Sequence, residues 1–211
     1  MHRWLFRLAI QPGFRVLDWL VPKQPDCWGF TGHHIKSDQF IENARAVFEC
    51  VKGDSAVGKV VFTRVDQPDF GIEDAVNVQL VPLQSWRGMW QLLRCGTLFL
   101  THSLAMDYAF RWGAREFGVL PLSLRRRRVI NLWHGIPLKA LYALANPAVR
   151  ARLDRVKFRR KERAGYAGLI CSSETDRHAM TAMFHPIHPD RVWLTGLPRN
   201  DFLRREFEAL P

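Results

Sequence analysis

The stretch Val129-Ile130-Asn131-Leu132-Trp133-His134-Gly135-Ile136-Pro137-Leu138-Lys139 carries the clearest structural signal in the chain. Its first part, residues 129–133, is almost wholly apolar, which is typical of a strand in a parallel sheet covered on both faces. A histidine then follows, with a glycine that lets the backbone turn sharply. We expect a buried strand that ends at His134, and a helix that opens at Pro137 and has Lys139 in its first turn.

Six other segments have a similar strand-like character, and longer helical patterns lie between them. The expected strands are 27–31, 59–64, 78–82, 97–101, 128–133, 167–171 and 192–195. The expected helices are 40–51, 86–93, 106–117, 147–163, 175–184 and 200–210. Strands that alternate with helices predict a Rossmann-like, doubly wound α/β domain with a mostly parallel sheet.

The composition suits a globular protein with a basic surface. The chain has 211 residues, of which 47% are hydrophobic, and its formal net charge is +11. Such a charge favours polyanions without choosing among nucleic acid, anionic lipid and phosphate-rich substrates. No G-x-G-x-x-G, G-x-x-x-x-G-K-[ST] or G-x-S-x-G motif occurs. The usual signals of dinucleotide enzymes, P-loop NTPases and α/β-hydrolases are therefore missing, and no nucleic-acid motif is recognised.

The N-terminal segment, residues 1–23, is apolar and basic but too short to span a bilayer. Trp4, Leu5 and Leu8 have helical spacing, Pro12-Gly13 interrupts the pattern, and apolar residues resume from Phe14. Two interpretations remain open: a helix that lies in a membrane interface, or a segment that packs on the domain or on a partner.

Chemistry is expected where strands end, because ligands of doubly wound sheets bind beyond the carboxyl ends of the strands. His134 has a side chain suited to a general base, although a histidine at a strand end is more often structural. Ser172 and Ser173 follow another strand and precede a helix, where capping is the commoner role and phosphate contact the alternative. Arg199 and Asn200 also follow a strand and precede a helix. Two roles remain open for Arg199: pairing with a phosphate, or pairing with a carboxylate.

Weaker signals lie elsewhere. His33-His34 and His102-Ser103 also follow predicted strands and are placed to line the same edge. Residues 185–189 contain two histidines, but the prolines among them make it implausible that these histidines bind a metal from one face of a helix. The four cysteines are widely spaced, so we expect reduced thiols, no metal site and no cofactor.

These motifs together resemble the CDP-glycerol glycerophosphotransferase family, whose members make teichoic acids and related polyol-phosphate capsule polymers. The resemblance rests on the W-H-G-x-P-L-K segment at 133–139, on Ser172-Ser173, and on the T-G-x-P-R-N-D segment at 195–201. Phe40-x-x-Asn43 is similar to a further position of the family.

The resemblance implies one half of a GT-B-like fold, with residues 24–211 as the N-terminal Rossmann-like domain. It implies that His134 is the general base and that Gly135, Lys139, Ser172, Ser173, Arg199 and Asn200 contact substrate or phosphate. The donor would be CDP-glycerol or a similar CDP-polyol, and the acceptor a phospho-polyol or a lipid-linked molecule. The protein would attach peripherally to an anionic membrane surface, on the cytoplasmic face of the cell membrane.

The donor-binding C-terminal domain of that family has no counterpart in these residues. We therefore expect the chain to be inactive alone, or to work only with a separate chain that carries that domain. Two other functions remain open: half of a nucleotide-sugar GT-B glycosyltransferase, and a non-catalytic fragment that binds membranes or polyanions.

Overall fold

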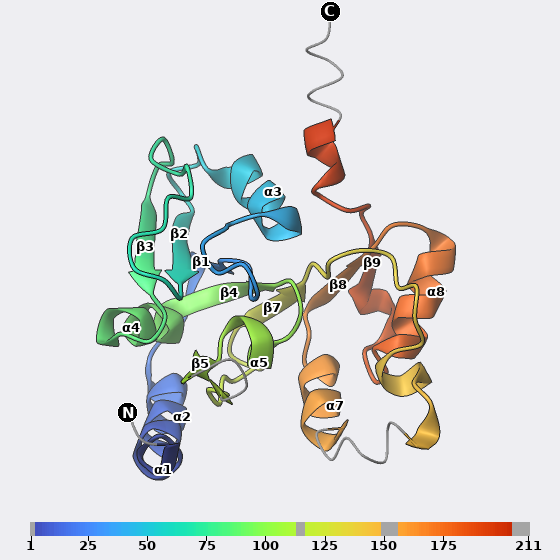
Figure 1. The fold of residues 1–211 in the computed structure, drawn as a ribbon, viewed down its shortest axis with the longest axis horizontal. Helices are drawn as coiled ribbons and strands as arrows, with labels where there is room; N and C mark the ends of the chain where they lie inside the picture. Colours follow the sequence, from blue (N-terminus) through green and yellow to red (C-terminus); the bar gives the residue numbers. More distant parts are fainter. Residues whose placement is uncertain (1–2, 113–116, 149–155, 204–211) are drawn as a thin grey trace, which may run out of the picture.

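The computed structural model of the chain describes residues 3–112, 117–148 and 156–203, and its centre is a seven-stranded sheet in which all strand pairs are parallel (Figure 1). The strand order is β3-β2-β1-β4-β7-β8-β9. The strands are β1 Gln24–Thr31, β2 Gly58–Thr63, β3 Val78–Pro82, β4 Cys95–Leu100, β7 Arg128–Asn131, β8 Gly168–Cys171 and β9 Val192–Leu194. All seven expected strands are confirmed, as is the doubly wound α/β fold.

Helices cover both faces of the sheet, and each face has its own apolar core. Helix α3, Glu42–Val51, lies on one side, while α4, Trp86–Arg94, and α5, Leu104–Asp107, lie on the other (Figure 1). Two further helices, α7 Val156–Ala164 and α8 Glu174–Met183, follow later in the chain. Side chains alternate between the cores, since Val60 and Phe62 join one and Val61 the other. Continuous apolar strands are what this two-sided burial requires.

The strand order reverses between β1 and β4, and this reversal locates the edge where ligands are expected. From β1 the chain adds strands outward through β2 and β3, then returns to add β4, β7, β8 and β9 on the other side. The carboxyl ends of β1 and β4 therefore mark the topological switch point, where ligands of such sheets bind.

The N-terminal segment packs on the domain, which is one of the two interpretations of its sequence. It is helical as α1 Arg3–Leu5, a π-helical turn Phe6–Ile10, and α2 Gln11–Leu20, so the expected interruption at Pro12-Gly13 is wrong. Pro12 sits at the start of α2, where its missing N–H costs little, and the π-helical turn precedes it. The buried side chains of Phe6 and Phe14 anchor the segment to the domain.

Its attachment is also electrostatic. The Asp18 carboxylate is buried, pairs with Arg127 and Lys23, and accepts a hydrogen bond from the Ser123 backbone N–H. Phe6 packs against Phe110, with ring centroids 5.6 Å apart. The segment is therefore an integral layer of the domain.

The helix expected over residues 106–117 is not formed in the described part of that range, residues 106–112 and 117. The structure has instead the short α5 and a small antiparallel pair, β5 Phe110–Arg111 and β6 Phe117–Gly118. Tertiary contacts override the helical pattern because the Asp107 carboxylate accepts the backbone N–H groups of Thr101 and His102, and Phe110 is drawn onto the N-terminal helix.

Other expected features are confirmed where they are described. The helix expected over 147–163 is seen as α7, while residues 149–155 lie outside the described part, as do residues 204–211 of the last expected helix. Cys27, Cys95 and Cys171 are buried free thiols among apolar side chains, as the sequence indicates. No helix in the described ranges has both the length and the apolarity to span a bilayer.

Candidate functional site

Four histidines from three neighbouring strand ends meet at the switch point, and we call them the histidine cluster: His33, His34, His102 and His134. The first two follow β1, the third follows β4 and the last follows β7. The ring centroids of His34 and His102 are 3.7 Å apart, and those of His102 and His134 are 4.5 Å apart. The expectation that His33-His34 and His102 line one edge with His134 is confirmed.

His134 is half-buried, and its ring packs against the rings of Trp133 and His102. It stacks on the indole of Trp133 with a centroid separation of 4.1 Å, and on His102 at 25° between ring planes. Burial lowers the pKa of His134 below the usual imidazole value, and His102 lowers it further. At neutral pH the ring is therefore uncharged and able to accept a proton.

His102 is oriented by groups at the end of its own strand. The Thr101 hydroxyl lies 3.0 Å from His102 Nδ1, and the buried Asp107 carboxylate lies 3.7 Å from the same nitrogen. Asn131 donates from its side-chain amide to the His102 carbonyl at 3.1 Å and accepts from the Trp133 N–H at 2.8 Å. Asn131 thus fixes the spacing between the loops that carry His102 and His134.

The other two histidines have distinct surroundings. His33 Nδ1 accepts backbone N–H groups from Ile35 and Lys36, and its Nε2 lies 3.9 Å from Glu42. His34 is buried, with no hydrogen-bond partner for its Nδ1 among the described residues. Burial and the nearby His102 lower the pKa of His34 to about 4.

Asn43 connects two segments that the sequence singled out separately. Its buried side-chain amide donates to the carbonyl oxygens of Leu132 and Trp133, at 2.9 and 3.1 Å. Its Oδ1 accepts the backbone N–H of Arg199 at 3.1 Å. A single side chain at the start of α3 therefore holds the loop after β7 against the loop after β9.

Arg199 lies beside the glycine of the first loop. A Cβ built on Gly135 would lie 3.4 Å from an Nη atom of Arg199, and the φ of Gly135 is +149°, which disfavours any other residue. The Arg199 charge contributes to the lowered pKa of His134. No carboxylate pairs with this guanidinium among the described residues. The alternative that Arg199 pairs with a phosphate therefore stays open. Asn200 is exposed and begins a helical turn.

The helix expected after Pro137 does not form, and Lys139 lies in an exposed loop. Trp133 has a φ of +49°, and with Gly135 it turns the backbone twice within three residues. The Asn43 side chain holds the first of these turns through the carbonyl oxygens of Leu132 and Trp133. The predicted phosphate site at a helix start near Lys139 is therefore wrong in its geometry, although the lysine lies in the same loop as His134.

Ser172 and Ser173 have mainly structural partners. Ser173 caps α8, accepting the Asp176 N–H on its hydroxyl at 3.1 Å, as the sequence predicts. Ser172 donates its hydroxyl to Asp176 at 2.9 Å. Both stand at the end of β8, one strand away from His134.

Sequence reasoning missed the acidic groups of the site. The carboxylate of Glu42, a residue with a φ of +64°, lies 3.9 Å from His33 Nε2. The carboxylate of Asp107 lies 3.7 Å from His102 Nδ1. Asp107 lies seven residues after the end of β4, and this closeness to a strand end was the signal that could have found it. The helical pattern of residues 106–117 instead predicted a place within a helix. Within the described ranges, no three histidine, cysteine or acidic side chains are placed to hold a metal ion.

Comparison with known proteins gives a consistent result. The sequence profile described as CDP-Glycerol:Poly(glycerophosphate) glycerophosphotransferase matches residues 15–209. No curated protein sequence matches.

Solved structures of the wall teichoic acid polymerase TagF share the fold. One aligns with a TM-score of 0.69 at 14% identity, covering 95% of this chain and 46% of the polymerase. A variant soaked with CDPG aligns with a TM-score of 0.70 at 14% identity, covering 92% and 44%. The chain thus spans about half the length of the polymerase.

Proposed function

Because the chain belongs to the CDP-Glycerol:Poly(glycerophosphate) glycerophosphotransferase family, we propose that it takes part in transferring glycerol phosphate, or a related polyol phosphate, from a CDP-polyol to an acceptor in cell-wall or capsule polymer synthesis. The chain supplies the acceptor-side half of the enzyme, one half of a GT-B-like pair. The observation that carries this proposal is a half-buried, uncharged imidazole at the switch point of the sheet.

His134 acts as the general base. It removes the proton of an acceptor hydroxyl, whose oxygen attacks the β-phosphorus of the CDP-polyol. The bond from that phosphorus to the bridging oxygen breaks, and CMP leaves with the electron pair. The stacked rings of Trp133 and His102 hold the imidazole in place, and a lowered pKa keeps it unprotonated at neutral pH.

Arg199 is placed to stabilise the charge of the transferred group. Its backbone is anchored by Asn43 and its guanidinium lies beside Gly135, next to the candidate base. A guanidinium matches phosphate in shape and charge. Lys139, Ser172, Ser173 and Asn200 lie on the same edge and are secondary candidates for contact with substrate.

A second α/β half faces this edge and carries the nucleotide. Apolar side chains project from the loops that bear the histidine cluster: Ile35 is 74% exposed, Ile136 59% and Leu138 94%. Such side chains suit an interface with another domain. Orienting donor against acceptor contributes on the order of 7–11 kcal/mol to reactions of this type, so the chain alone is expected to be a poor catalyst.

The N-terminal segment attaches the enzyme to the cytoplasmic face of the membrane. Opposite its buried face, Trp4, Leu8, Val16 and Trp19 are exposed, and Arg7 and Arg15 are exposed beside them. Exposed tryptophans with arginines suit the interface of an anionic bilayer. This location would bring the histidine cluster to lipid-linked acceptors.

The competing function is half of a nucleotide-sugar glycosyltransferase, and donor choice separates the two. The protein is tagged at its own locus and captured from its cells with any chain that accompanies it. It is then supplied with a phospho-polyol acceptor and either CDP-glycerol or UDP-sugars. Acceptor-dependent release of CMP supports the proposal, whereas UDP release without CMP release contradicts it.

A further inference from the structure

Two buried thiols from neighbouring strands meet in the part of the sheet that lies away from the histidine cluster. Cys27 lies in the first half of β1 and Cys95 begins β4, and their sulfur atoms are 3.4 Å apart. The other two cysteines have different surroundings: Cys50 is exposed, and the Cys171 thiol donates to the Trp193 carbonyl at 3.3 Å. Cys27 and Cys95 are therefore the thiols that the fold holds in contact.

The two strands are close enough for a covalent link between these side chains. Neighbouring strands lie about 4.7–4.9 Å apart, and the Cα atoms of a disulfide are usually about 4.4–6.8 Å apart. The register between β1 and β4 is irregular here, since Gln24 pairs with Cys95 and Trp28 with Thr97, and the thiols meet within this irregularity. A disulfide bond is about 2.05 Å long, so each sulfur atom has to move by about 0.7 Å toward the other.

A cavity gives small molecules in solution access to Cys27. It holds about 520 Å³ at the amino ends of β1 and β2, and Cys27 is part of its wall. Three other residues of the wall, Asp26, Ala56 and Asn77, are exposed, so the cavity opens to solvent. Cys95 is fully buried. A small oxidant that enters the cavity therefore meets Cys27 before Cys95.

The two thiols also differ in how readily they ionise. The hydrogen bond with Cys95 lowers the pKa of the Cys27 thiol, and the charge of Arg94, another residue of the cavity wall, lowers it further against the effect of burial. The same hydrogen bond and burial raise the pKa of Cys95 well above its ordinary value. Because the thiolate is the nucleophilic form of cysteine, Cys27 is the thiol that reacts first.

We propose that Cys27 and Cys95 form a redox-active pair that hydrogen peroxide converts to a disulfide. The Cys27 thiolate attacks one peroxide oxygen, the O–O bond breaks, and hydroxide leaves as Cys27 becomes a sulfenic acid. The Cys95 sulfur then attacks the Cys27 sulfur, the S–O bond breaks, and the oxygen leaves as water with the proton of Cys95. Two thiols are oxidised and one peroxide is reduced, which gives one disulfide and two water molecules.

The disulfide would join the two strands that lead to the histidine cluster. β1 leads to His33 and His34, and β4 leads to His102. Neither thiol takes part in the proposed transfer of polyol phosphate. The inference therefore goes beyond the proposed function, and its test needs no activity assay.

The test is a map of the cysteines after oxidation of the reduced full chain. Trypsin places each cysteine in its own peptide: 24–36, 46–52, 95–111 and 164–177. The folded chain is treated with hydrogen peroxide, the remaining thiols are blocked with N-ethylmaleimide, and the peptides are identified by mass spectrometry. We expect the linked pair of 24–36 and 95–111 to exceed every other linked pair by about tenfold or more. Dithiothreitol should reverse the link.

Two variants, each lacking one fully buried thiol, separate this pair from general cysteine oxidation. Cys95→Ala should abolish the link and leave Cys27 as a sulfenic acid, which dimedone captures. Cys171→Ala is the matched control and should form the link as the unaltered chain does. Circular dichroism of both variants excludes misfolding as the cause of a loss.

Three outcomes would overturn the proposal, and the unaltered chain alone is enough to show each of them. The first is no link between 24–36 and 95–111 at a peroxide concentration that oxidises the exposed Cys50. The second is an equal yield of all linked pairs. The third is a link that forms only after the chain is unfolded in urea.

Discussion

The side-chain amide of Asn43 donates to the backbone carbonyl of Trp133 at 3.1 Å, across 90 positions of the sequence. Because the same side chain accepts the Arg199 N–H, the first turn of α3 fixes the relative positions of the candidate base and the candidate phosphate-binding arginine. The alignment of the site therefore depends on one neutral, fully buried amide.

Asn43→Ala is expected to lower the free energy of unfolding by about 2–4 kcal/mol, because it leaves buried backbone groups without partners. Urea denaturation followed by circular dichroism measures this change. Asn200→Ala, at an exposed position, is the control and should change stability by no more than about 0.5 kcal/mol. Equal small effects would mean that Asn43 does not hold the two loops together.

Gly135→Ala is expected to cost about 1–3 kcal/mol of stability, since a φ of +149° is strained for any residue with a Cβ. The same Cβ would lie in ordinary contact with the Arg199 guanidinium, 3.4 Å away, so the cost comes from the backbone alone. Gly13→Ala is the matched control, because nothing lies within 4 Å of a Cβ built on this helical glycine. It should raise stability by up to about 1 kcal/mol, as alanine favours the helix more. A neutral Gly135→Ala would contradict the observed turn.

Acid should destabilise the protein through His34. Its pKa in the folded chain is about 4, below the ordinary 6.5, so the unfolded chain binds more protons between these values. The free energy of unfolding should therefore fall as pH drops from about 6.5 to about 4, and a shift of one pKa unit corresponds to about 1.4 kcal/mol. In His34→Gln the decline between pH 7.5 and pH 4.5 should be shallower. Parallel pH profiles for the two proteins would rule His34 out as the cause.

Membrane attachment should depend on the exposed apolar face of the N-terminal segment. Trp19→Glu is expected to reduce flotation with phosphatidylglycerol vesicles several-fold, because a tryptophan at the bilayer interface is replaced by a carboxylate. Trp86→Glu changes an even more exposed tryptophan on α4, 83% exposed against 67%, and should float like the unaltered chain. Similar flotation of all three proteins would mean that the N-terminal segment does not attach the protein to membranes.

The sheet could be predicted from sequence because its strands are buried on both faces and are therefore nearly continuous in apolar residues. The start of β1 escaped notice, since Gln24-Pro25-Asp26 is polar and pairs with β4 across an irregular register. The gathering of the histidines at one edge could also be predicted, because the carboxyl ends of parallel strands lie at the same edge of a sheet.

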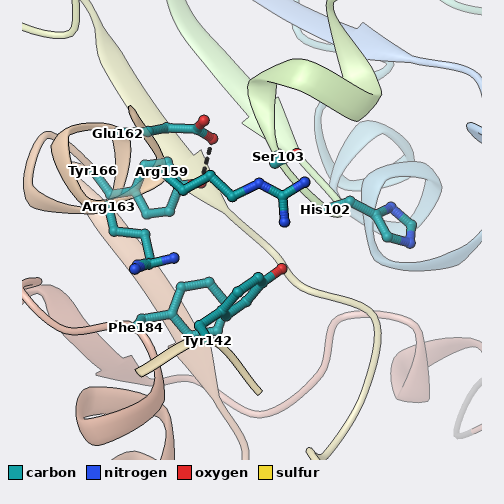
Figure 2. Close-up of a pocket in the computed structure, with 8 residues that line it drawn as sticks. All are labelled: His102, Ser103, Tyr142, Arg159, Glu162, Arg163, Tyr166 and Phe184. Atoms are coloured by element: carbon teal, nitrogen blue, oxygen red, sulfur yellow. Dashed lines mark hydrogen bonds between the residues drawn. The ribbon is translucent and has the colours of Figure 1, made fainter. Parts of the chain in front are cut away.

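The parts that could not be predicted depend on contacts between distant segments. In place of the helix expected from Pro137, the backbone turns at Trp133 and Gly135, and Asn43 of α3 holds the first of these turns. The helix expected over 106–117 is lost to the buried carboxylate of Asp107 and to the packing of Phe110 on Phe6. A small pocket between His102, Tyr142 and Arg159 is built from α7, the loop after β4 and the turn at Tyr142, and no local pattern brings these segments together (Figure 2).

The central claim is that His134 is the base of a CDP-polyol transferase, and CMP release tests it most directly. The protein captured from its own cells is compared with the His134→Ala form, with equal amounts of folded protein, saturating CDP-glycerol and a phospho-polyol acceptor. Loss of a general base should slow acceptor-dependent CMP release on the order of 10²–10⁴-fold. Release by the alanine form at a rate close to that of the unaltered protein would contradict the account.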